Sequence, residues 1–414
     1  MRRILVLGGG FAGLWSAAGA ARKLDELGIG GTDVEVTLVN RDAYHSIRVR
    51  NYEADLAATR VPLSEVLDPI GVRLVEGDVR SIDFARQTVD VQGAGGAVVL
   101  AYDRLVFALG SELVRRPLPG FAEYAFDIDT YDGAARLESH LGRLVAEATS
   151  PTMGDRARWV VLVVGAGLTG IEAAAELPGR LRALRDASGE EGREVRVILA
   201  DHGDHIGSDM GAAAQPVIAE ALTALGVETR TGVRVSALSA AGATLESGEL
   251  IPAGTIVWCA GMRANQLTEL FPVQRDRLGR LPVNEFLQVK GMPHVFAAGD
   301  SAVAMMDEQH ASVMSCQHGR PMGRFAGHNV VCDLLGLPML PLRIDWYVTV
   351  LDLGPWGALY TEGWDRHVVA VGATAKATKR VINCERIYPP RGGDRREILE
   401  AAAPVVQRPP AYQS

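Results

Sequence analysis

Cysteine is scarce in this 414-residue chain. It contains four cysteines, all of them after residue 258, and no two of them form a C-x-x-C pair. Isolated cysteines, here Cys259, Cys316, Cys332 and Cys384, are typical of small buried residues in a reducing compartment. The pattern therefore predicts neither a disulfide framework nor a metal site.

Long apolar runs and an excess of positive charge are also absent. No apolar run reaches the roughly 18–20 residues that a bilayer-spanning helix needs. The 42 basic residues are outnumbered by 50 acidic ones, giving a net charge of −8, which argues against nucleic acid as a partner. The chain passes directly from Met1-Arg2-Arg3 into a predicted strand, unlike a cleaved signal peptide. We therefore expect a cytoplasmic protein without a transmembrane segment, and peripheral contact with the inner face of the cell membrane stays open.

Glycine, in contrast, is abundant, with 46 residues, and six of these glycines form the same motif twice. Residues 8–13 follow the apolar run 4–7, and residues 165–170 follow the apolar run 160–164, each reading G-x-G-x-x-G. The first glycine permits a tight turn, the second lets the backbone approach a pyrophosphate, and the third lets helix and strand pack closely. Two copies indicate two dinucleotides in one chain, and two adjacent dinucleotides indicate electron transfer between them.

The segments around each motif predict a β-α-β unit. The first unit is a strand at 4–7, a helix at 11–27 and a strand at 34–39; the second is a strand at 160–164, a helix at 168–186 and a strand at 195–200. Continuous apolar strands are typical of parallel sheets buried on both faces. The fold class predicted is α/β, with two Rossmann-like dinucleotide-binding domains and a smaller C-terminal α+β segment.

The domain organisation follows from these units. A Gly-Asp strand end at 294–300 and a helix at about 317–335 indicate that the chain returns to the first domain. Beyond them we expect strands at 344–353 and 367–373, one short helix at 395–403, and a tail from Pro389 that is loosely ordered at its end. The predicted parts are 1–115 and 271–335 for the first domain, 116–270 for the second, and 336–414 for the C-terminal segment.

Four further stretches carry a family resemblance. They are Tyr102–Ser111, Ile251–Asn265, Gly279–Asp300 and Cys316–Gly319. Together with the glycine motifs they resemble the pyridine nucleotide–disulfide oxidoreductase superfamily, and within it the type II NADH dehydrogenases, which are single-chain NADH:quinone oxidoreductases. The resemblance covers residues 1 to about 330.

The resemblance implies FAD at the first motif. Asn40 stands where an acidic residue usually holds the ribose, and Asp42 is an alternative for that contact. Asp300 is expected at a helix N-terminus, where it would contact the ribitol or phosphate end of FAD; an ordinary helix cap is the alternative. The FAD-binding residues implied are Gly8, Gly10, Phe11, Ala12, Gly13, Asn40, Arg41, Gly110, Gly299, Asp300 and Gln317.

The resemblance implies a pyridine nucleotide at the second motif. Asp201, at the end of the predicted strand 195–200, suits a free ribose 2′-hydroxyl and favours NADH, while the nearby Arg196 and His202 keep NADPH open. Glu172 is implied as a catalytic residue where nicotinamide meets flavin; a first-turn carboxylate that complements the helix dipole is the alternative. The nucleotide-binding residues implied are Gly165, Gly167, Leu168, Thr169, Gly170, Asp201, Ala260 and Gly261.

The acceptor side departs from the resemblance. Residues 44–55 hold no cysteine where disulfide reductases carry their redox pair, so electrons would pass directly from flavin to an external acceptor. Gln317, the second implied catalytic residue, begins the quinone segment, but Pro321 and Met322 replace its two later glutamines and Arg320 precedes them. These changes favour an anionic or carbonyl-bearing acceptor.

Two groups of basic and histidine side chains receive structural interpretations. His45 is expected to be structural, and His318 to be a packed or surface residue rather than a proton donor. The cluster Lys376, Lys379 and Arg380 is expected on a solvated helix face, and contact with an anionic substrate or lipid headgroup is the alternative.

The function predicted is an FAD-dependent NADH:acceptor oxidoreductase with a quinone as the first choice of acceptor. A soluble flavoprotein that acts on a specialised metabolite, and a flavin redox sensor without turnover, both stay open. The expected partner is a small-molecule electron acceptor, and a homodimer is also kept open.

Overall fold

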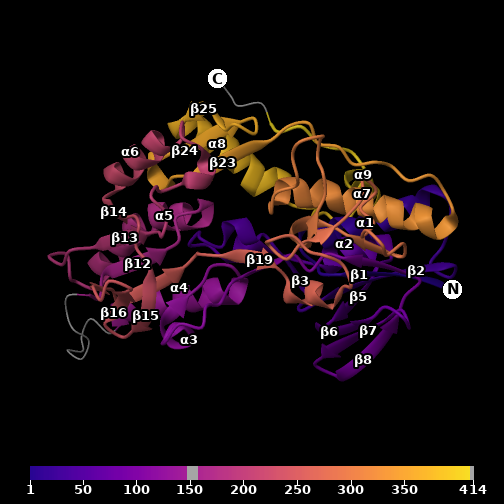
Figure 1. Cartoon of the computed structure of the whole chain (residues 1–414), viewed down its shortest axis with the longest axis horizontal. Coiled ribbons are helices and arrows are strands. Elements are labelled where there is room, and N and C mark those ends of the chain that lie inside the picture. Colours follow the sequence, from indigo (N-terminus) through magenta and orange to yellow (C-terminus); the bar gives the residue numbers. More distant parts are fainter. Residues whose placement is uncertain (147–156, 411–414) are drawn as a thin grey trace.

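The first unit is built on a five-stranded parallel sheet. The computed structural model describes residues 1–146 and 157–410, and the strand order in this sheet is β21-β9-β1-β2-β5. Strand β21 lies beside β9, so the chain returns to this sheet after it has formed the second unit. In Figure 1 an orange part of the chain accordingly lies beside the indigo part. The bounds are β1 (Arg2–Leu7), β2 (Val34–Asn40), β5 (Arg73–Glu76), β9 (Arg104–Phe107) and β21 (Val295–Ala297).

Two helices pack against each other beside this sheet, with glycines between them. They are α1 (Phe11–Glu26) and α7 (Cys316–Leu335), which confirms the helix predicted at 317–335. A Cβ atom at Gly323 would lie 2.3 Å from the Ala12 carbonyl oxygen, and one at Gly327 would lie 2.2 Å from that of Ser16. The two backbones therefore touch, and the first turns of both helices lie at the same end of the pair.

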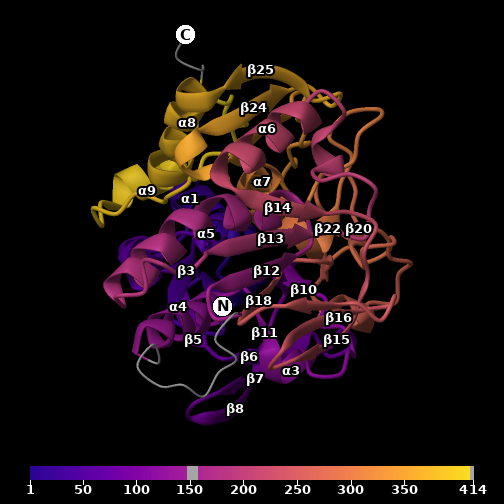
Figure 2. The same cartoon turned by 90° about the vertical axis from the view of Figure 1, so that its left-hand side faces the viewer.

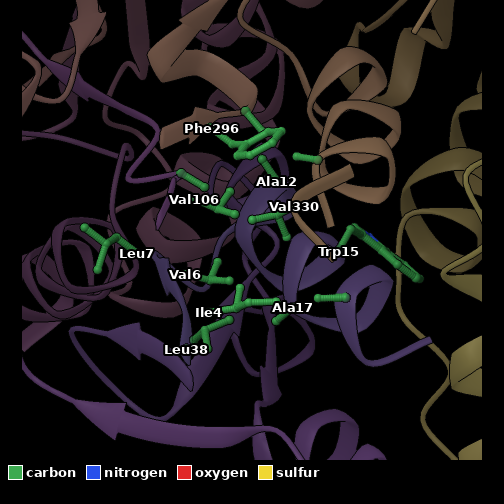
Figure 3. Packing of buried hydrophobic residues seen from close by; sticks show 14 of the residues in the cluster. Ile4, Val6, Leu7, Ala12, Trp15, Ala17, Leu38, Val106, Phe296 and Val330 are labelled. Carbon is green, nitrogen blue, oxygen red and sulfur yellow. The ribbon is translucent and has the colours of Figure 1, made fainter. Parts of the chain in front are cut away.

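The core of the first unit lies between the sheet and this helix pair. Val6, Val330 and Phe296 are fully buried there, and Trp15 is 1% exposed (Figure 3). The ring of Phe271 contacts Phe107 of the sheet and Phe84, which follows the first strand of an antiparallel meander. The meander consists of β6 (Asp78–Asp83), β7 (Thr88–Gly93) and β8 (Gly96–Ala101).

The second unit repeats the pattern around a sheet of order β11-β18-β12-β13-β14. Side chains of β12 alternate between two buried faces, as the period of a strand requires. Val161 and Val163 pack in a cluster with the helices, whereas Val160, Leu162 and Val164 pack with a meander on the other face. The helices and the meander lie on opposite sides of the sheet in Figure 2. The continuous apolar run predicted at 160–164 is thereby confirmed as a strand that is buried on both faces.

The elements of the second unit have the following bounds. Its sheet contains β11 (Ala125–Phe126), β12 (Val160–Val164), β13 (Arg196–Ala200), β14 (Val227–Arg230) and β18 (Thr255–Trp258); its helices are α4 (Tyr131–Ala146), α5 (Leu168–Ala187) and α6 (Gln215–Leu225); its meander contains β15 (Val235–Ser239), β16 (Gly242–Leu245) and β17 (Leu250–Pro252).

A short antiparallel ribbon joins the two units. It pairs β10 (Ser111–Leu113) with β19 (Met262–Ala264), so the outgoing and returning segments cross side by side. The remaining short elements are β3 (Tyr44–Ser46), β4 (Arg60–Pro62), α2 (Ser64–Leu67), α3 (Phe121–Tyr124), β20 (Leu281–Pro282) and β22 (Ala302–Val303).

The C-terminal segment contacts both units (Figure 1). It contains β23 (Val348–Asp352), β24 (Ala358–Glu362), β25 (His367–Val371), α8 (Gly372–Val381), a π-turn at Ile382–Arg386 and α9 (Arg395–Ala401). Leu351 and Leu359 pack in the helix-side core of the second unit, whereas Ile398 and Leu399 pack in the core of the first.

Two expectations for this segment need correction. The sequence indicated no strand at β24, and the strands expected at 344–353 and 367–373 are shorter, at Val348–Asp352 and His367–Val371. The short helix expected at 395–403 within the tail is confirmed as α9, which buries Ile398 fully against the first unit. The final residues 411–414 of that predicted tail lie outside the described residues. Among the helices of residues 1–146 and 157–410, none is long and apolar enough to cross a bilayer.

Candidate active site

The first glycine motif forms a tight turn between β1 and α1. Gly8 has a φ of +101°, and a Cβ atom there would lie 2.4 Å from the Ala108 carbonyl oxygen. A Cβ atom at Gly13 would lie 1.7 Å from the Gly8 carbonyl oxygen. A Cβ atom at Gly10, in contrast, would meet nothing within 4 Å. Packing therefore requires glycine at the first and third positions, while the second faces open space.

The second motif has the same geometry between β12 and α5. Gly165 has a φ of +106°, and a Cβ atom there would lie 2.7 Å from the Ala260 nitrogen. A Cβ atom at Gly170 would lie 1.8 Å from the Gly165 carbonyl oxygen. At Gly167 the nearest atom would be Asp209 Oδ2, at 3.8 Å. The open second position is thus common to both copies.

The helices that follow these turns begin without a side-chain cap. Gly10 and Gly167 are the N-cap residues of α1 and α5, and neither can offer an oxygen to the free N–H groups. By comparison, Ser315 caps α7 and Asp394 caps α9. Uncapped N–H groups at a helix N-terminus bind anions, and the open space in front of each fits a dinucleotide pyrophosphate.

Two side chains hold the Gly9 peptide of the first turn. Asn40 Oδ1 accepts a hydrogen bond of 2.8 Å from the Gly9 N–H, and His45 Nδ1 lies 2.8 Å from the Gly9 carbonyl oxygen. His45 is fully buried, and burial lowers its pKa to about 4, so the neutral ring donates through Nδ1. The structural role expected for His45 is confirmed, whereas the ribose contact of Asn40 stays a prediction. Arg41 lies on the surface beside Asp78.

Asp201 occupies in the second turn the place of Asn40 in the first. Its Oδ2 accepts a 2.7 Å hydrogen bond from the Ala166 N–H, and its Oδ1 accepts one of 2.7 Å from the Gly203 N–H. His202 Nδ1 lies 3.2 Å from the same Oδ1. The carboxylate therefore stands at the C-terminal end of β13 beside the glycine turn, where a ribose hydroxyl would lie.

Asp300 lies at the junction of the two units. Its Oδ2 accepts a 2.7 Å hydrogen bond from Ser111 Oγ, which in turn accepts from Arg48. Arg48 also pairs with Asp129 of the second unit. The expected helix N-terminus was wrong, because Asp300 lies in a single 3₁₀ turn (Gly299–Ser301) followed by β22. Close packing of Gly299 is evident, since its Cβ would lie 2.7 Å from Ala12 Cβ.

Glu172 is buried and ion-paired. Its Oε1 accepts a 2.7 Å bond from Lys379 Nζ and a 3.0 Å bond from the Asp352 N–H. It lies beyond the first turn of α5, so the dipole-complementing alternative does not hold. Although burial alone would lower the pKa of Lys379, the adjacent Glu172 carboxylate raises it, so the ammonium keeps its charge.

Lys379 corrects an expectation about the basic cluster. Its side chain is 10% exposed, so it does not lie on a solvated face. Lys376 is partly buried and pairs with Asp352, while Arg380 is exposed. Asp352 Oδ2 also accepts from the Tyr52 hydroxyl at 3.2 Å. Sequence reasoning missed Tyr52, Asp352 and Lys379 as site residues because they come from segments far apart in the chain.

Gln317 lies in the first turn of α7. Its Oε1 accepts a 3.3 Å hydrogen bond from the Val348 N–H, and its Nε2 is buried without a hydrogen-bond partner among the described residues. An orphaned amide donor of this kind fits a carbonyl oxygen of a flavin ring. The next residue, His318, is fully buried and accepts from the Val313 N–H through Nδ1 at 2.9 Å, which agrees with a packed histidine.

Strand β23 connects the two predicted catalytic residues. Gln317 binds the N–H of its first residue, Val348, and Glu172 binds that of its last, Asp352. Four strand steps span roughly 13 Å. The C-terminal segment thus joins the α7 N-terminus of the first unit to the α5 helix of the second.

The remaining predicted residues lie around these turns. Gly110 and Gly261 have left-handed φ values of +71° and +84° at the ends of β9 and β18, and Ala260 packs against Gly165. Phe11, Ala12, Leu168 and Thr169 are the first residues of the two uncapped helices. All four cysteines are free. Cys332 is buried as expected, Cys259 and Cys316 are partly buried, and Cys384 is exposed, so the expectation of burial fails at Cys384.

The fold and its two glycine sites define a flavoprotein oxidoreductase that takes electrons from a pyridine nucleotide. Residues 2–323 match the sequence profile described as pyridine nucleotide-disulphide oxidoreductase. The chain belongs to that family.

Three individual proteins resemble this chain. The chain is 58% identical over 411 residues to an NADH dehydrogenase-like protein of Mycobacterium tuberculosis, covering 99% of this chain and 100% of that protein. It is 26% identical to a type II NADH:quinone oxidoreductase of Staphylococcus saprophyticus, covering 94% and 95% of the two chains. The fold is also that of NDH2 from Plasmodium falciparum in complex with NADH, with a TM-score of 0.76, 13% identity and 97% of each chain covered.

Proposed function

We propose that this protein oxidises NADH and reduces a quinone. In the balanced reaction, NADH, one proton and the quinone give NAD⁺ and the quinol. The observation that carries the proposal is the bridge formed by β23, which contacts Gln317 of the first unit and Glu172 of the second. The relative named type II NADH:quinone oxidoreductase supports the same reaction.

The residues divide between holding the two dinucleotides and holding their rings. The uncapped α1 and α5 N-termini would bind the two pyrophosphates. When bound, FAD supplies the chemistry of accepting a hydride and passing on two electrons. Gln317 Nε2 would donate a hydrogen bond to the flavin ring, and the Glu172–Lys379 pair would orient the groups where nicotinamide meets it.

The nucleotide proposed is NADH rather than NADPH. Asp201 places a carboxylate beside the Ala166 N–H at the end of β13. A carboxylate there accepts from a ribose 2′-hydroxyl and repels a 2′-phosphate.

Anaerobic stopped-flow absorbance in the visible flavin band tests the proposal. Mixing the holoprotein with NADH should bleach the band faster than mixing it with NADPH, and adding a quinone should restore it. Glu172→Gln should slow one of these steps, whereas Glu220→Gln, an exposed control on α6, should change neither. Bleaching without recovery by any quinone would refute the quinone acceptor, and a protein that NADH does not bleach would refute the oxidoreductase.

A further inference from the structure

A cavity lies between α1, α7 and the C-terminal segment. Its volume is about 300 Å³, and its wall includes Trp15 of α1, Arg320 and Arg324 of α7, and Tyr388 of the C-terminal segment. Trp15 extends from α1 toward that segment (Figure 3). The sequence singled out only Arg320 of these residues.

Arg386 of the C-terminal segment also lines this cavity, and neither Arg320 nor Arg324 has a carboxylate partner among the described residues. Arg324 is 2% exposed, the Nε atoms of both side chains are buried without an acceptor, and neither guanidinium forms an ion pair within residues 1–146 and 157–410. Their guanidinium carbons lie 5.5 Å (Arg320) and 4.5 Å (Arg324) from the Trp15 ring centroid.

Such an arrangement is costly without an anion. Burying a cation costs several kcal/mol unless an opposite charge accompanies it, and like charges four residues apart on a helix repel each other. Burial lowers the pKa of Arg320 to about 10, and burial with the Arg320 charge lowers that of Arg324 to about 9. An anionic group from outside the chain would remove this cost.

The two arginines lie on the same face of α7 as Gln317, the residue proposed to contact the flavin. Gln317, Arg320 and Arg324 stand at i, i+3 and i+7, so they form one stripe along the helix. Seven helical residues span roughly 10 Å. A small molecule about 10 Å long could therefore reach from the arginines toward the flavin ring that Gln317 is proposed to hold.

We infer that the Arg320–Arg324 cavity binds an acidic group of the electron acceptor, so that the acceptor is a quinone that itself carries a carboxylate, sulfonate or phosphate. The identification of the ligand as a quinone rests on the proposed function, whereas the presence of an anion site does not. Glu385 and Glu397 lie exposed at the rim of the cavity and are the competing partners for the arginines.

Steady-state kinetics with saturating NADH test the acceptor. The probes are 1,2-naphthoquinone-4-sulfonate, which is anionic, and menadione, which is neutral. Arg324→Met should lower kcat/KM for the sulfonate by about tenfold or more, the value of one charge-assisted contact, and change menadione by less than about twofold. Arg396→Met removes an equal charge from an exposed site and should change neither. An equal loss with both quinones, or no loss with either, would overturn the inference.

Calorimetric titration of the oxidised holoprotein with 2-naphthoate tests the site without turnover. The wild type and Arg324→Lys should bind, and Arg324→Met should bind about tenfold more weakly. Binding of 2-naphthoate together with failure of every quinone would support the anion site and refute the proposed function alone. Binding that Arg324→Met leaves unchanged, equal affinity for inorganic phosphate, or a crystal structure with Glu385 or Glu397 paired to the arginines would overturn the inference.

Discussion

Replacing the middle glycine of each motif by alanine should weaken cofactor binding while changing the stability of the apoprotein little. Gly10 and Gly167 have φ values of −72° and −74°, with ψ near 180°, a conformation that any residue adopts. A Cβ atom would meet no atom within 4 Å at Gly10 and none closer than 3.8 Å at Gly167. Alanine at either position should therefore change the stability of the apoprotein by no more than about 1 kcal/mol, because the gain through the unfolded chain is offset by the poorer N-cap preference of alanine.

The added methyl group would nevertheless occupy the space in front of the helix N-terminus. We expect Gly10→Ala to lower FAD affinity and Gly167→Ala to lower NADH affinity, each by about tenfold or more, which corresponds to roughly 1.4 kcal/mol. Gly179→Ala is the matched control, because Gly179 lies in the same helix as Gly170 and its Cβ would also meet nothing within 4 Å. It should gain stability without any change in affinity.

The assays are urea unfolding of the apoproteins, flavin content after dialysis, and the NADH concentration dependence of flavin bleaching. Replacing the third glycine of a motif should, in contrast, lower the stability of the protein. Gly170→Ala should destabilise the second unit, because its Cβ would lie 1.8 Å from a carbonyl oxygen. Unchanged NADH affinity in Gly167→Ala would refute the placement of the pyrophosphate, and a loss of FAD in the same variant would mean that the two sites are exchanged.

Three further predictions concern charged groups. Asp201→Asn keeps an acceptor for the Ala166 N–H but removes the negative charge, so the apparent KM for NADH should rise more than that for NADPH. If the preference for NADH over NADPH is unchanged, Asp201 does not contact the ribose. Glu172→Gln should destabilise the protein by roughly 3–5 kcal/mol because it leaves Lys379 buried without its partner, and adding Lys379→Met should recover part of that loss in urea unfolding; additive losses would contradict the pairing. The pKa of His45 is lowered to about 4 in the folded protein, so stability should fall as the pH decreases from about 6.5 toward 4, by up to about 3 kcal/mol; His45→Asn keeps a donor for Gly9 and should weaken this pH dependence.

The sequence predicts those structural features that depend on residues close together in the chain. Both glycine turns and the strands β1 and β12 follow from short motifs, because the steric reasons for glycine act within a few residues. The Glu172–Lys379 pair does not follow, since its partners are 207 residues apart and lysine is rarely buried without a partner.

The C-terminal segment was hard to predict for a related reason. Strand β24 contains Leu359 and Tyr360, both of which are fully buried, so its side chains do not alternate between apolar and polar in the way that identifies a half-buried strand. Helix α8 buries Lys379 and Thr378, polar residues that periodicity assigns to a solvated face. In both cases the tertiary partners decide the burial, and the local pattern contains no information about them.

The asparagine at position 40 has a physical explanation in the loop that follows it. Its Nδ2 donates to the carbonyl oxygens of Asp42 at 2.9 Å and Tyr44 at 3.1 Å, while its Oδ1 accepts from the Gly9 N–H. A carboxylate would satisfy Gly9 but would set a negative oxygen against two carbonyl oxygens. Asn40→Asp should therefore cost about 1–2 kcal/mol and loosen the turn that is proposed to hold the FAD pyrophosphate, despite restoring the acidic residue typical of a ribose site.

Flavin retention and urea unfolding of Asn40→Asp at neutral pH measure this cost. Asp201 makes no such donor contacts, since both of its oxygens accept from backbone N–H groups, so Asp201→Asn serves as the reciprocal variant. If Asn40→Asp binds FAD more tightly than the wild type does, then the ribose contact outweighs the two loop hydrogen bonds, and the loop is not the reason for asparagine.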